Sequence, residues 1–98
     1  MENLQTFTQF LESDQFTKII NKCEWLGKET ILYAKEISDN LFLLFILEND
    51  KKIRAVIARF TCITNIGIRN PEQILFHLSL QKKEDLHYFE KYLHFSEN

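Results

Sequence analysis

Seven consecutive apolar residues, Leu41 to Leu47, constrain the fold of this chain more than any other feature. Turn-forming and charged residues flank the run on both sides. A membrane-spanning helix needs about 20 apolar residues, and ordinary helices are also longer than this run. We therefore expect a central strand that is covered on both faces. Because 98 residues offer little material for two covering layers, we expect a second copy or a partner protein to cover one face.

The composition predicts one folded domain that spans residues 1–98. Hydrophobic residues make up 45% of the chain and charged residues 27%, which is typical of a globular protein and not of a disordered tail. The net charge of -2 argues mildly against nucleic-acid binding. The N-terminal residues lack an export signal, and Cys23 and Cys62 have no CxxC spacing. We therefore expect a cytoplasmic protein, in its own cell or in a host cell, with buried free thiols.

Two apolar stripes predict two helices in the N-terminal third of the chain. In one continuous helix these stripes would lie on nearly opposite sides, so we expect a break near Ser13 and Asp14. Ser13 would then be the N-cap of the second helix, and Gly27 would end it. The stripes consist of Leu4, Phe7, Phe10 and Leu11, and of Phe16, Ile19, Ile20 and Cys23.

Three further segments predict strands at 30–37, 41–47 and 53–63, and the short links between them predict antiparallel hairpins. Apolar and polar residues alternate over 74–81, which favours a fourth strand. A helix over the same residues, capped by Asn70 with Pro71 in its first turn, is the alternative.

From Lys83 onwards the apolar residues return to helical spacing, and Glu84 and Asp85 lie in the expected first turn. The predicted fold class is therefore α+β: an antiparallel three- to four-stranded meander with N-terminal helices and a C-terminal helix. Its element order is α-α-β-β-β-β-α.

The common catalytic and nucleotide-binding motifs are absent from the sequence. With two glycines in the chain, neither a Walker loop nor GxGxxG is possible, and no GxSxG or HExxH occurs. His87, Glu90 and His94 would share one face of a helix, but the two imidazoles would lie about 10 Å apart along its axis, too far to bind one Zn²⁺ together. We therefore expect no enzyme activity, no cofactor and no metal.

The favoured function is that of a small acidic protein-binding module, which acts by occupying the surface of a partner protein. Nine phenylalanines and a strand that is apolar on both faces support this interpretation. Inhibitors, immunity or counter-defence proteins, antitoxins and secretion chaperones all belong to this class. Aromatic residues dominate binding hot spots, so we expect an interface of Phe42, Leu44 and Phe45, with Tyr88 and Tyr92 as further anchors. A homodimer would use the same residues.

Two alternatives remain open on the sequence. The first is a nucleic-acid-binding protein that uses Lys51, Lys52 and Arg54, although Glu48 and Asp50 in the same hairpin would cancel part of the positive field. The second is a small-ligand-binding protein or an enzyme without a recognisable motif. We expect no membrane partner.

Overall fold

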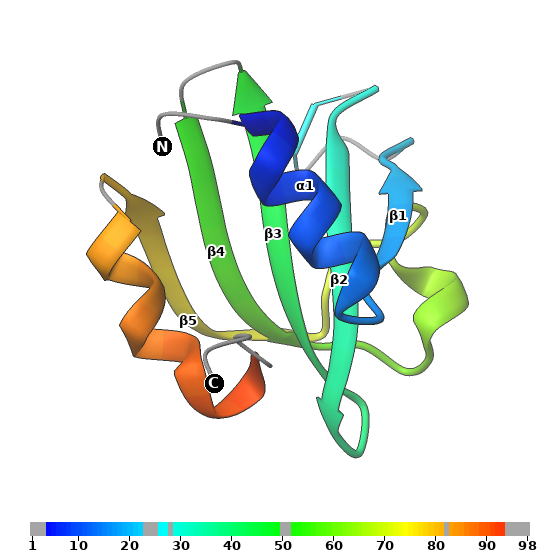
Figure 1. Cartoon of the computed structure of the whole chain (residues 1–98). Coiled ribbons are helices and arrows are strands. Elements are labelled where there is room, and N and C mark those ends of the chain that lie inside the picture. The colour runs from blue at the N-terminus through cyan, green and yellow to red at the C-terminus, as the bar shows by residue number, and fades with distance from the viewer. Residues whose placement is uncertain (1–3, 23–25, 28, 50–51, 82, 94–98) are drawn as a thin grey trace.

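The computed structural model describes residues 4–22, 26–27, 29–49, 52–81 and 83–93. Five antiparallel strands form one sheet in the order β1-β2-β3-β4-β5, so each strand lies beside the one that precedes it in the chain (Figure 1). The strands are β1 (Thr17–Ile20), β2 (Ile31–Ser38), β3 (Leu41–Asn49), β4 (Lys52–Arg59) and β5 (Gln73–Leu80). The helices are α1 (Leu4–Ser13) and two 3₁₀ helices, η1 (Ile63–Asn65) and η2 (Lys83–Tyr92).

The predicted fold class is wrong, because the structure has five strands and a single α-helix within the described residues. The second N-terminal helix does not form: Thr17–Ile20 is strand β1, and Thr17 pairs with Ala34 of β2. Gln15 ends α1 in the left-handed region, with a φ of 72°, and turns the chain back toward the sheet. The β-branched residues that follow fit a strand better than a helix. Cys23, the last residue of the expected stripe, lies outside the described residues.

The C-terminal part of the chain agrees with the sequence in its buried face and differs in its helix type. Residues 73–80 form a strand, so the alternation predicted this strand correctly and the alternative helix is wrong. The expected C-terminal helix is the 3₁₀ helix η2. Leu86, Phe89 and Leu93 are buried, as the helical spacing predicted.

The central strand β3 is covered on both faces by this chain itself. On one face α1 and η2 pack over the sheet, as Figure 1 shows. On the other face the loop of residues 60–72 contributes Phe60 and Ile66 to a second cluster. The first cluster contains Phe7, Leu11, Phe16, Tyr33, Leu43, Phe45, Ile53, Ala55, Leu80, Leu86, Phe89 and Leu93. The second contains Leu32, Ala34, Phe42, Leu44, Ile46, Val56, Ala58, Phe60 and Ile66.

The expectation that a second chain must cover one face of β3 is therefore corrected. The 60–72 loop can serve as a covering layer because its ends are hydrogen-bonded to the sheet region. The Phe60 amide donates to the Asn40 carbonyl at 3.0 Å, and the Glu72 amide donates to the Arg59 carbonyl at 2.8 Å. These bonds hold the loop across the sheet face, where its apolar side chains exclude water from β3.

Candidate functional site

The two edges of the sheet differ in length and in composition. The β1 edge is four residues long, and Lys18 is exposed on it. Just beyond β1, the Lys22 amide donates to the Gly67 carbonyl at 2.6 Å, so the loop that holds η1 lies beside this edge (Figure 1). Short strands, lysines and covering loops are devices by which proteins prevent an edge from pairing with another chain. The β1 edge is therefore protected.

The β5 edge is twice as long as the β1 edge, and it carries no lysine. Its sequence, QILFHLSL, contains no lysine, arginine, aspartate, glutamate or proline. Within the part of the chain that the structure describes, β5 pairs with β4 alone. Its outer backbone groups therefore have no strand partner among these residues, which makes the edge a template for another strand.

Three consecutive large apolar side chains are exposed on β5. The exposed fractions are 49% for Ile74, 48% for Leu75 and 39% for Phe76. Phe76 lies opposite Ile57 and Ile74 lies opposite Ala58, so Leu75 is the extra residue of a β-bulge. Because Ile57 and Ala58 point to opposite faces of the sheet, the bulge places apolar side chains on both faces of one edge.

The 3₁₀ helix η2 packs beside this edge and adds aromatic surface. The Phe76 ring meets the Phe89 ring edge to face, with centroids 5.8 Å apart. This contact fixes η2 on one face of β5. Tyr88, which precedes Phe89, is 68% exposed. The β5 edge, defined here as residues 73–80 together with Tyr88, is the candidate binding site.

The structure does not bring the five predicted interface residues together. Phe42 is 1% exposed, and Leu44 and Phe45 are fully buried. Phe42 and Leu44 belong to the cluster under the loop, while Phe45 lies beneath α1 and η2. These three side chains cannot reach a partner of the folded chain, so we do not retain them as anchors. Tyr92 is partly buried, which leaves Tyr88 as the exposed member of the predicted set.

The basic hairpin has part of its charge neutralised, as the sequence suggested. Lys52 Nζ lies 3.8 Å from Glu48 Oε1, and Arg54 forms an ion pair with Glu48 Oε2. Lys51 and Asp50 lie outside the described residues. Because one carboxylate faces both described cations, this surface attracts a phosphate backbone less than two unpaired cations would.

Two of the three metal-ligating side chains considered in the sequence, those of His87 and Glu90, lie in the described part of η2. His87 Nδ1 lies 3.5 Å from Glu90 Oε1, both side chains are exposed, and His94 falls outside the described part. No group of three or more metal-ligating side chains is found among the residues that the structure describes.

Cys62 is exposed, so the expectation of a buried thiol is wrong for this residue. It follows Thr61 in the covering loop, where the apolar pattern of β4 has already ended. The thiol lies 2.9 Å from the Thr64 hydroxyl, and this hydrogen bond lowers the pKa of the Cys62 thiol.

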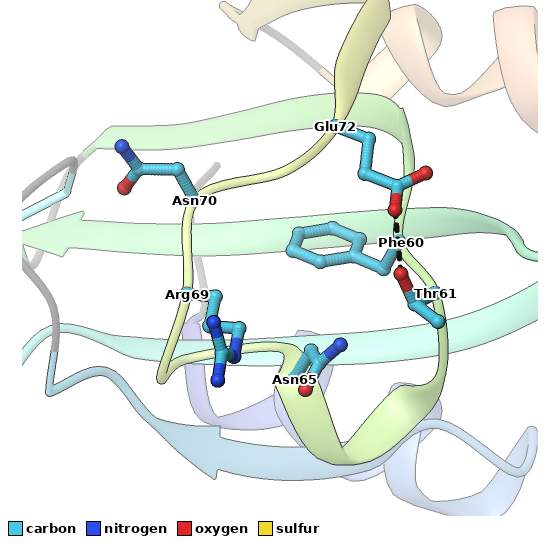
Figure 2. Close-up of a pocket in the computed structure, with 6 residues that line it drawn as sticks. All are labelled: Phe60, Thr61, Asn65, Arg69, Asn70 and Glu72. Carbon is cyan, nitrogen blue, oxygen red and sulfur yellow. Dashed lines mark hydrogen bonds between the residues drawn. The ribbon is translucent and has the colours of Figure 1, made fainter.

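Residues of the covering loop also line a pocket of about 560 Å³ that is open to solvent (Figure 2). The Phe60 ring points into the loop, and the Thr61 hydroxyl donates to Glu72 Oε2 at 2.5 Å. The lining combines a guanidinium, two carboxamides and a carboxylate, a mixture that suits small polar molecules without selecting one chemical class. The lining residues are Phe60, Thr61, Asn65, Arg69, Asn70 and Glu72.

Comparison with known proteins gives no relative: no protein-family model, no curated protein and no solved structure matches this chain. Among the described residues, no helix has the length and apolar character that crossing a membrane requires.

Sequence reasoning missed the β5 edge as a site, although a signal for it was present. The predicted strand segment 74–81 is longer than Leu41–Leu47 and, like it, contains no charged residue. A terminal position in the meander would have made this strand an edge. The signal was not used because the same residues also fit a helix.

Proposed function

We propose that this chain is a protein-binding module that contacts polypeptides through the β5 edge. The observation that supports the proposal is an eight-residue edge strand without charged residues, on which Ile74, Leu75 and Phe76 are exposed side by side. An extended segment that added to this edge would satisfy its outer backbone groups and cover these side chains. The module would thus act by occupying part of its partner, as inhibitors, immunity proteins and chaperones do.

The contrast between the two edges argues that the exposure of β5 has a use. Proteins that need no strand partner protect their edges against aggregation. Here the β1 edge is short, carries Lys18 and lies beside the 60–72 loop, whereas the β5 edge is eight residues long and uncharged and carries a bulge at Leu75. The Lys52 and Arg54 pairing with Glu48 makes nucleic acid the less favoured partner.

We also place the module in the cytoplasm. Cys62 is an exposed thiol that forms no disulfide with the described residues, so it is accessible to oxidants. A reducing compartment keeps such a thiol free.

Site-specific photo-cross-linking in the cells that express the protein tests the proposal. A photoreactive benzoylphenylalanine replaces Leu75 on β5 in one variant and Thr17 on β1 in a matched control. Both positions are exposed and lie on edge strands. We expect a discrete polypeptide adduct from position 75 and none from position 17. Adducts from both positions, or from neither, would refute binding at the β5 edge.

A further inference from the structure

We propose that the β5 edge binds a second copy of this chain, so that two β5 strands pair antiparallel about a twofold axis and form a ten-stranded sheet. This inference rests on the proposed function, because it names the occupant of the same edge.

Charge is the first argument for a second copy. Antiparallel pairing of β5 with itself about an axis near its centre places most of its residues opposite other residues of the same eight. Because none of these residues is a lysine, arginine, aspartate or glutamate, no like charges meet where the two β5 strands overlap. In most strands that contain charged residues, antiparallel self-pairing would bring some like charges close together. Charge repulsion therefore does not oppose the pairing of two β5 strands.

The difference between the edges is the second argument, because it determines which assembly can close. Pairing of β5 with β1 of another copy would repeat indefinitely and give a filament. The short β1 strand, the exposed Lys18 and the bond between Lys22 and Gly67 oppose that arrangement. Pairing of β5 with β5 ends after two copies and leaves the protected β1 edge at both ends of the sheet.

The position of η2 is the third argument. A twofold axis that relates two strands of one sheet is perpendicular to the sheet, so both η2 helices lie on the same face, on either side of the axis. Phe76 is on this face through its contact with Phe89, and the exposed Tyr88 lies on η2. Aromatic side chains from both copies therefore flank the new strand pair, where they can bury apolar area.

The mass of the full chain in solution is the first measurement, by analytical ultracentrifugation or native mass spectrometry. We expect a species with twice the chain mass of 11.8 kDa at a protein concentration of about 0.1 mM. This dimer should dissociate only on strong dilution. Leu75→Lys should give a monomer, because it places two lysines at the new strand pair. Thr17→Lys, a change at an exposed position on the β1 edge, should leave the dimer intact. If Leu75→Lys lowers the melting temperature of the protein, Ile74→Lys is measured in its place.

A cysteine scan then tests the antiparallel geometry. In a chain whose own Cys23 and Cys62 are replaced by serine, single cysteines are placed in turn at positions 75 to 78. Only the residue on the twofold axis lies opposite the same residue of the other copy, with the two Cα atoms about 5 Å apart. For each neighbouring residue, the Cα atoms of the two copies are roughly 8 Å apart. We expect one position to form an oxidised dimer readily, and Thr17→Cys to form none. Equal cross-linking at all positions would overturn the ordered pair.

The outcomes separate this inference from the proposed function. A monomer at every concentration, together with an adduct of another polypeptide at position 75, would refute the homodimer and retain protein binding at β5. A monomer without any adduct would refute both. A dimer that survives both lysine changes at β5 would show that the copies meet elsewhere.

Discussion

At the scale of single residues, Lys35 connects three parts of the fold. Its Nζ lies 3.4 Å from Asp14 Oδ2 and donates a hydrogen bond to the Tyr92 carbonyl at 3.1 Å. The same ammonium lies over the ring of Phe16, 5.4 Å from its centroid. Lys35 on β2 thereby connects the turn after α1 to the end of η2. Because both charged side chains are largely buried, the pair is more important for stability than a surface ion pair.

Replacement of Lys35 should lower the free energy of unfolding. We expect Lys35→Met to lower the free energy of unfolding by about 2 to 3 kcal/mol, because it leaves a buried carboxylate with one cation fewer and the Tyr92 carbonyl without its donor. Urea denaturation of the variant measures the loss. Lys18→Met, at an exposed position on β1, is the control and should change the free energy by less than about 0.5 kcal/mol. A similar loss in both variants would contradict the role of the buried pair.

At the scale of elements, the errors of sequence interpretation arise from short segments. The stripe at 16–23 fits a helix over two turns, but a segment this short also fits a strand. The turn at Gln15 and the ladder from Thr17↔Ala34 to Ile20↔Ile31 decide in favour of the strand. The break after Ser13 could be predicted because two stripes conflict there. The bulge at Leu75 could not, because it depends on the register with β4.

The covering loop is the element whose role the sequence did not show, and Gly67 is important for its position. With a φ of +87°, this residue adopts a conformation that side chains disfavour, and an added Cβ would lie 2.7 Å from Ile19 Cγ2. The neighbour is a branched methyl close to the backbone of β1, so it has little room to move. Gly67 therefore allows the loop to approach β1 closely.

We expect Gly67→Ala to destabilise the protein by about 2 to 3 kcal/mol, through backbone strain and the contact with Ile19. Gly27→Ala is the matched control, because Gly27 has a similar φ of +92° but its added Cβ would meet Thr30 Oγ1 at an ordinary 3.6 Å. Gly27→Ala should lower the free energy of unfolding by about 1 kcal/mol, from backbone strain alone. Chemical denaturation measures both, and equal losses would show that the close approach to β1 is unimportant.

At the scale of the whole molecule, the run from Leu41 to Leu47 predicted the centre of the fold but not what covers it. This run lies in β3 and pairs on both sides, and its central residues Phe42 to Ile46 are buried on both faces, as we expected. The covering layers came from η2, from α1 and from an irregular loop. The sequence placed Phe60 in a strand at 53–63, but β4 ends at Arg59. Irregular segments have no periodic pattern, so the burial of Ile66 could not be predicted, and the open face was assigned to a partner instead.

Because β3 contributes to both clusters, the two sides of the sheet should unfold together. Phe45→Ala removes the ring that meets Phe7 and Phe89 on one face, and Phe42→Ala removes the ring that meets Phe60 on the other. We expect each change to cost about 3 to 4 kcal/mol, since fully buried rings leave cavities, and to shift one shared transition. Urea unfolding followed by far-ultraviolet circular dichroism and by fluorescence measures whether the two signals coincide. Two separate transitions would contradict a common core. Lys18→Met, at an exposed site on β1, should leave stability nearly unchanged.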